Sequence, residues 1–130
     1  MIIAVDFDGT IVEDAYPAIG KPKLFAFESM KELQKRGHDL ILWTVRKGKY
    51  LDEAVEFCKN HGVEFYAVNK SYPNEEQGSS RKIQADLFID DRIVGGFPGW
   101  GEVLQMIDPS EFSKPEKPEE KGFFKKLFGR

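Results

Sequence analysis

The sequence contains a single cysteine, Cys58, so no disulfide bond can form within the chain. Such sparing use of cysteine is typical of proteins in reducing compartments. Cys58 also recurs at helical spacing with Leu51 and Val55, which favours a buried packing role over a nucleophilic one. These observations predict a cytoplasmic protein whose fold depends on packing alone.

Long apolar runs are also missing, because no stretch approaches the roughly 20 residues that a membrane-spanning helix requires. The first apolar run begins at residue 2 and has the length and β-branched content of a buried strand. It leaves no room for the charged region and cleavage site of a secretory leader. We therefore expect neither a transmembrane segment nor a signal peptide.

An excess of positive charge is absent as well, since 19 Lys and Arg face 22 Asp and Glu, for a net charge of -3. Residues 114–130 carry a net +3, which leaves -6 on the remainder. A body of that sign predicts no general affinity for nucleic acid or for anionic membranes. At 130 residues, the chain is long enough for one domain with a short appendage.

Hydrophobic patterning and turn residues predict alternating strands and helices. Gly37 and Gly62 are expected to end the first two helices. Strands that alternate with helices predict right-handed crossovers and a parallel sheet, that is, an α/β fold. The expected elements are strands at 2–5, 39–45, 63–68 and 87–89 and helices at 23–36, 49–61 and 100–107.

The composition changes after residue 108, where prolines stand among charged residues and the sequence GFFKKLFGR ends the chain. We therefore expect a domain at 1–108 and an appendage at 109–130. As a helix, the last nine residues are basic and amphipathic, which is typical of segments that dock on a membrane surface or a partner. Packing on the chain's own domain or on a second copy is the alternative.

Four carboxylates follow strands of the expected sheet. Asp6 and Asp8 come directly after the first strand, and Asp90 and Asp91 come directly after the last one. Because the carboxyl ends of parallel strands meet at one edge of a sheet, these groups are expected to lie close together. Carboxylates held so close repel one another unless a cation lies between them, so the sequence predicts a site for a hard cation such as Mg²⁺.

Other polar side chains are expected at the same edge. Thr44 ends the second strand and Lys82 precedes the fourth, so a hydroxyl and an ammonium group could bind a phosphoryl group beside the metal. Arg46 and Asn69 also follow strands. Each is a candidate for substrate contact, and the alternative is that it ties down a loop.

The sequence DFDGT at a strand end, then a strand ending in Thr44, then Lys82 and the pair Asp90–Asp91, resembles the four motifs of the haloacid dehalogenase-like (HAD) superfamily over about residues 1–108. The segments WTVR, IDDR and GGFPGW are similar to those of small bacterial and bacteriophage members. The resemblance implies a three-layer α/β/α Rossmann-like fold. Its function would be that of a Mg²⁺-dependent phosphomonoesterase.

The resemblance also implies residue roles. Asp6 would attack phosphorus to form an aspartyl-phosphate, and Asp8 would protonate the leaving oxygen and then activate water. Mg²⁺ would be held by the Asp6 carboxylate, the Asp8 carbonyl and Asp90, with Asp91 as a direct ligand or through water. Thr44 and Lys82 would contact the phosphoryl group, and Arg81 is the alternative to Lys82.

Relatives that act on small metabolites often insert a cap domain, but here only 13–22 and 69–80 stand at the insertion points. The resemblance therefore implies a capless, open site for a phosphorylated small molecule or macromolecule, or a homo-oligomer in which a second subunit supplies the lid. Two other functions stay open. One is a non-catalytic module that binds a phosphorylated ligand, and the other is a phosphatase for nucleic-acid ends.

Overall fold

The structure is a computed structural model that describes residues 1–76 and 80–109. The chain divides into two compact units, Met1–Phe97 and Pro98–Arg130, so the division lies before the last helix, whereas the composition changes only after residue 108. The first unit holds every predicted site residue. The predicted docking segment GFFKKLFGR lies outside the described residues.

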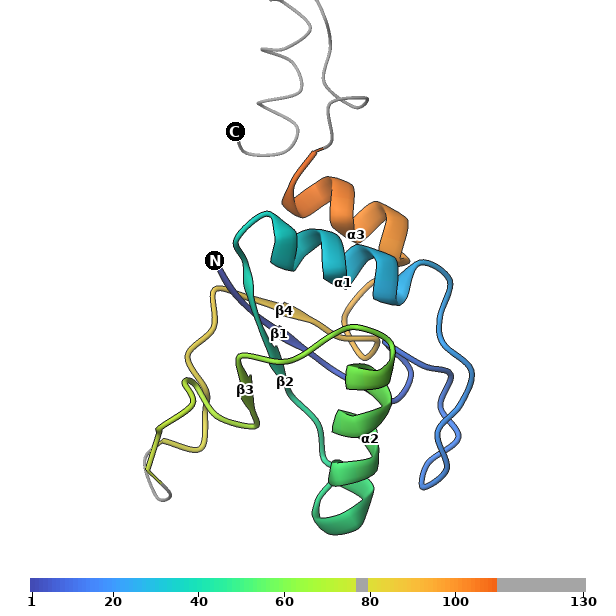
Figure 1. Cartoon of the computed structure of the whole chain (residues 1–130). Helices are drawn as coiled ribbons and strands as arrows, with labels where there is room; N and C mark the ends of the chain where they lie inside the picture. Colours follow the sequence, from blue (N-terminus) through green and yellow to red (C-terminus); the bar gives the residue numbers. More distant parts are fainter. Residues whose placement is uncertain (77–79, 110–130) are drawn as a thin grey trace, which may run out of the picture. The chain divides into compact units, whose positions relative to one another are not determined.

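Within the described residues, one sheet of four parallel strands forms the centre of the first unit, in the order β3-β2-β1-β4 (Figure 1). The strands are β1 (Ile2–Val5), β2 (Asp39–Leu42), β3 (Ala67–Val68) and β4 (Leu87–Ile89). β1 is central, because Ile3 pairs with Leu40 of β2 on one side and with Leu87 of β4 on the other. The predicted parallel α/β sheet is thus confirmed, and the carboxyl ends of its strands share one edge.

Two helices connect the first three strands, α1 (Ala26–Lys35) and α2 (Gly48–Asn60). The chain moves in the same direction across the sheet in both crossovers, so right-handed connections place both helices on one face. Ring contacts join them there, since Phe27 of α1 lies 6.0 Å from Phe57 of α2 and 4.4 Å from His61, between ring centroids. Cys58 of α2 is fully buried, as its helical spacing predicts.

A second set of sheet residues packs against a loop segment rather than against a helix. Ala4, Ile41 and Ala67 occupy paired positions of β1, β2 and β3 and form a buried cluster with Ile83. Ala85 packs against the same cluster. The segment that leads into β4 therefore supplies core side chains although it forms no helix or strand there.

The predicted boundaries were too wide for three elements. The first helix begins at Ala26 and not at residue 23, because Phe25 has a left-handed backbone (φ 64°) and the Lys23 amide donates to the Ile11 carbonyl. β3 begins only at Ala67, because the Val63 amide is bonded to the Cys58 carbonyl at the end of α2. At the first helix a hydrogen bond to a distant part of the chain overrides the local apolar pattern, and at β3 the hydrogen bonds that end α2 do so.

The second strand ends at Leu42 rather than at residue 45. The Thr44 amide donates to the Asn69 side chain instead of to a neighbouring strand, and Val45 is 91% exposed.

Both helix stops are confirmed, since Gly37 and Gly62 have positive φ values of 94° and 90°.

The second unit contains α3 (Trp100–Ile107), whose buried residues are Trp100 and Val103. α3 is the predicted last helix with the same boundaries. None of the helices in the described part of the chain has the combined length and apolar character that crossing a membrane requires.

Candidate functional site

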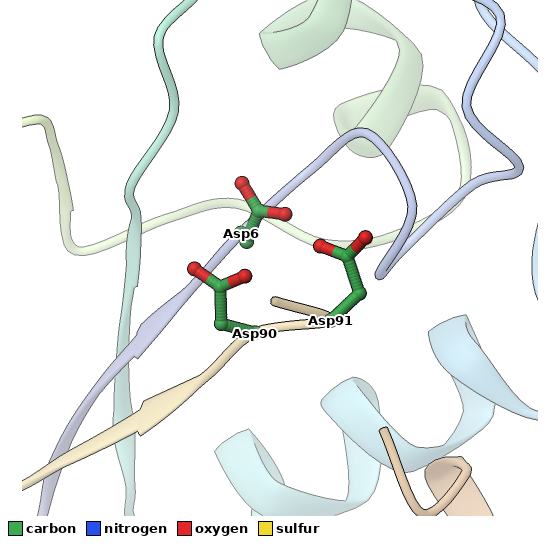
Figure 2. Close-up of side chains that lie close together, drawn as sticks. All are labelled: Asp6, Asp90 and Asp91. Atoms are coloured by element: carbon green, nitrogen blue, oxygen red, sulfur yellow. The ribbon is translucent and has the colours of Figure 1, made fainter. Parts of the chain in front are cut away.

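The ends of β1 and β4 bring three carboxylates together. Asp6 directly follows β1, Asp90 and Asp91 directly follow β4, and the Asp6 amide donates to the Ile89 carbonyl at 2.9 Å, which holds the two strand ends side by side. One carboxylate oxygen from each aspartate lies within 4.8 Å of the others. Figure 2 shows the three side chains pointing toward one another. The predicted convergence of Asp6 with Asp90 and Asp91 is therefore present.

The turn after β1 supplies a fourth polar group, the Thr10 hydroxyl. Thr10 is fully buried, and its Oγ1 lies 3.1 Å from Oδ2 of Asp6 and 3.2 Å from Oδ1 of Asp91. Gly9 permits this approach: it has φ 88°, and a Cβ added there would lie 2.8 Å from Cγ of Asp91. Sequence reasoning read Gly9 and Thr10 only as parts of a motif, although their position next to two aspartates was a usable signal.

The three carboxylates of this cluster repel one another when they are charged, and this affects their pKa values. Burial raises the pKa of Asp6 to about 7, and the hydrogen bond to Asp91 and the charge of Asp90 act in the same direction. For Asp91, burial alone would raise the pKa, but the hydrogen bonds from Asp6 and Thr10 outweigh it and lower the pKa. Near pH 7, both protonation states of Asp6 are therefore populated. The protonated form donates a hydrogen bond to Asp91, and the charged form repels Asp90 and Asp91.

The donor set suits a hard divalent cation. Three carboxylate oxygens at this separation match the all-oxygen coordination of Mg²⁺, which commonly uses one or two carboxylates plus water and substrate oxygens. A bound cation would also favour the charged form of Asp6, which burial and the neighbouring aspartates disfavour. Asp6, Asp90 and Asp91 are therefore the residues that could hold it.

Asp8 lies apart from this cluster, because its carboxylate is paired with Arg46. Asp8 Oδ2 accepts from Nε and Oδ1 accepts from Nη2 of Arg46, both at 2.8 Å, in a two-pronged ion pair. Arg46 is buried, and its remaining N–H groups donate to backbone carbonyls. Of the two roles predicted for Arg46, this geometry fits tying down a loop, not substrate contact.

Thr44 and Asn69 occupy neighbouring strand ends, as predicted. The Thr44 amide donates to Oδ1 of Asn69 at 2.8 Å, and Oγ1 of Thr44 accepts from the Arg46 amide at 3.1 Å. Oδ1 of Asn69 therefore holds the backbone after β2, which fits the loop-fixing alternative for this residue. The Thr44 hydroxyl keeps its own proton, which it can still donate.

Lys82 is not brought to the carboxylates. Its side chain is exposed and lines a cavity of about 610 Å³ together with Ile2 and Asp86, which lie at the start of β1 and just before β4. Asp6 stands four residues further along β1 than Ile2, or about 13 Å at the usual rise of a strand. The structure thus places Lys82 at this cavity and outside the group formed by Asp6, Asp90 and Asp91, and its contact with a phosphoryl group stays a prediction. The alternative residue, Arg81, is exposed beside it.

Among solved structures, the chain is similar to a conserved protein of Bacteroides thetaiotaomicron. The two are 60% identical with a TM-score of 0.80, and the match covers 86% of this chain and 93% of that one. No protein-family model matches the chain, and no curated protein does. Identity at this level over nearly the whole length of the second protein shows common membership: the chain belongs to the same protein family as the conserved Bacteroides thetaiotaomicron protein.

Proposed function

We propose that the chain is a capless HAD-like phosphomonoesterase that depends on Mg²⁺ and uses Asp6 as its nucleophile. The observation that carries this proposal is the meeting of Asp6, Asp90 and Asp91 at the carboxyl edge of the sheet, beside the central strand. The strand order β3-β2-β1-β4 and the short connection at 13–22 agree with a capless member of the HAD superfamily.

In the proposed reaction, an oxygen of Asp6 attacks phosphorus, and the bond from phosphorus to the ester oxygen breaks. The leaving oxygen takes up a proton as the alcohol departs. Water then attacks phosphorus of the aspartyl-phosphate, which releases inorganic phosphate and restores the Asp6 carboxylate. Asp6, Asp90 and Asp91 would hold Mg²⁺, which would supply positive charge that stabilises the phosphoryl oxygens.

Asp8 and Thr44 have the supporting roles in this proposal. The Asp8 carboxyl group gives a proton to the leaving oxygen and then takes one from the attacking water, while Arg46 holds it in place. The Thr44 hydroxyl donates to a phosphoryl oxygen. The proposal assigns no step to Lys82, which lines a cavity with Ile2 and Asp86.

The direct test is a phosphatase screen with Mg²⁺ over nucleotides, sugar phosphates, phosphopeptides and oligonucleotides with phosphorylated ends. We expect hydrolysis of at least one class, lost on addition of EDTA and restored by Mg²⁺. Cleavage confined to the oligonucleotides would identify a phosphatase for nucleic-acid ends. Tight binding of beryllofluoride, a phosphoryl mimic, without turnover would instead identify a non-catalytic module that binds a phosphorylated ligand.

Mg²⁺ should stabilise the protein more at pH 8 than at pH 5. The pKa of Asp6 is raised from 3.8 to about 7, so its contribution to the free energy of unfolding is full below pH 3.8 and is lost as the pH rises through 7. A cation that binds the charged form offsets that loss. At ten times its dissociation constant, Mg²⁺ should add about 1.4 kcal/mol at pH 8 and much less at pH 5.

Urea unfolding at the two pH values, with Mg²⁺ or with NaCl of equal ionic strength, measures this difference. NaCl is the control for general screening of charge. Equal stabilisation by Mg²⁺ at both pH values would contradict a site that contains Asp6.

A further inference from the structure

Arg46 is a buried arginine with every donor in use. Its side chain is 1% exposed, and Nε and Nη2 donate to the Asp8 carboxylate. Nη2 also donates to the Ala18 carbonyl at 2.8 Å, while Nη1 donates to the carbonyls of Pro17 at 3.1 Å and Tyr50 at 3.3 Å. The five N–H groups of one guanidinium thus join the end of β1, the 13–22 connection and α2.

Aromatic rings cover this guanidinium as well. Its central carbon lies 5.0 Å from the centroid of Phe7 and 5.1 Å from that of Tyr16. The Tyr16 ring in turn contacts Tyr50 edge-on, with centroids 5.9 Å apart. Cation–π contacts of this kind favour a planar guanidinium over the compact ammonium of lysine.

The connection at 13–22 is closed at its base before it reaches Arg46. The Glu13 amide donates to the Lys21 carbonyl at 2.7 Å, and Val12 forms a bridge with Pro22. Arg46 then holds the middle of the connection through Pro17 and Ala18. Two separate sets of hydrogen bonds therefore fix this segment beside the end of β1.

Arg46 is itself fixed by the ends of two further strands. Its amide donates to Oγ1 of Thr44, which follows β2. The Thr44 amide donates to the side chain of Asn69, which follows β3 and has a left-handed backbone (φ 54°). The Asp8 carboxylate is therefore held, through Arg46, by a hydrogen-bonded series that crosses three strand ends.

We propose that Arg46 is a positioning residue of this site: it fixes the Asp8 carboxylate and the 13–22 connection at the end of β1, and contacts no substrate itself. The inference rests on the proposed phosphatase function for its catalytic consequence. Its structural part, the fixing of Asp8 and of residues 13–22, stands on the contacts alone. An Asp8 free to rotate would lose its place relative to a phosphoryl group on Asp6, and misplacement by about 1 Å can cost about 100-fold in rate.

Arg46→Lys tests the proposal, because lysine keeps the charge but cannot make the two-pronged contact. We expect a folded variant that binds Mg²⁺ within about twofold of the wild type, because Asp6, Asp90 and Asp91 are untouched. Its kcat should fall about 100-fold with little change in KM. Arg36→Gln, which removes the 2.8 Å ion pair between Arg36, just after α1, and Glu32 of α1, is the control and should leave kcat unchanged.

Asp8→Asn and the double variant separate positioning from general structural support. If Arg46 acts through Asp8, Arg46→Lys should lower kcat far less in the Asp8→Asn background than in the wild type. Equal loss in both backgrounds would overturn the proposal. So would a folded Arg46→Lys variant whose kcat lies within about twofold of the wild type.

A readout without substrate keeps this inference separate from the proposed function. Amide hydrogen exchange of residues 13–22 should speed up at least about tenfold in Arg46→Lys, while exchange in β1 and β2 stays near that of the wild type. If the wild type hydrolyses no phosphomonoester, the proposed function fails, and hydrogen exchange alone decides the positioning role. Unchanged protection at 13–22 would then overturn it.

Discussion

Replacing Asp6 by asparagine is expected to abolish hydrolysis and, in the metal-free protein at pH 8, to raise the free energy of unfolding. An amide cannot attack phosphorus, so kcat should fall at least about 1,000-fold. The same change removes a negative charge from beside Asp90 and Asp91. Because burial and those neighbours raise the pKa of Asp6 from 3.8 to about 7, its charged form destabilises the fold at pH 8.

After allowance for solvent screening of this half-buried group, the gain should be about 1–2 kcal/mol at pH 8 and should vanish near pH 4, where Asp6 is protonated in the native state. Urea unfolding in EDTA measures the gain in the free energy of unfolding, and initial rates with Mg²⁺ measure the loss of hydrolysis. Asp52→Asn, which changes an exposed acid on α2, should alter neither quantity. An active Asp6→Asn protein would refute the nucleophile assignment, and a less stable one would refute the charge repulsion.

Gly9→Ala should disrupt the acidic cluster without removing any of its charges. Gly9 has φ 88°, where a side chain is strained, and its Cβ would lie 2.8 Å from Cγ of Asp91. Asp91 has to move, and its hydrogen bond with Thr10 and its approach to Asp6 are lost with it. We expect Mg²⁺ affinity to fall at least about tenfold and the free energy of unfolding to fall by about 2–3 kcal/mol.

Gly37→Ala is the matched control for this substitution. Gly37 has nearly the same backbone, φ 94°, but no atom lies within 4 Å of the added Cβ. It should lose about 1 kcal/mol from backbone strain alone and bind Mg²⁺ as the wild type does. Titration of Mg²⁺ by calorimetry compares the two, and equal affinities in both variants would contradict the role of Gly9.

The sequence was sufficient to place Asp6 with Asp90 and Asp91, because they follow strands whose carboxyl ends share one edge of a parallel sheet. Each of these residues directly follows a strand, so no loop conformation enters the prediction. Thr10 was overlooked for a local reason: its contact with Asp91 depends on the tight turn at Gly9, which no periodic pattern describes.

Lys82 and Arg46 illustrate what sequence patterns do not determine. Lys82 lies in the described stretch 80–86, which forms no helix or strand and packs Ile83 against the sheet, and no hydrophobic repeat predicts that path. Arg46 is a charged residue beside an exposed valine, and its burial depends on carbonyls from residues 17, 18 and 50 that converge only in the folded chain. Long-range polar networks of this kind leave no periodic signal.

Cys58, the lone thiol, gives the molecule an internal reporter of its own opening. The side chain is fully buried in α2, and burial raises its pKa to about 12, so almost no reactive thiolate exists in the native state. Alkylation of this single sulfur is therefore governed by how often α2 leaves the sheet. The alkylation rate therefore measures how often α2 unfolds locally, and it can be compared between variants without adding a label to the chain.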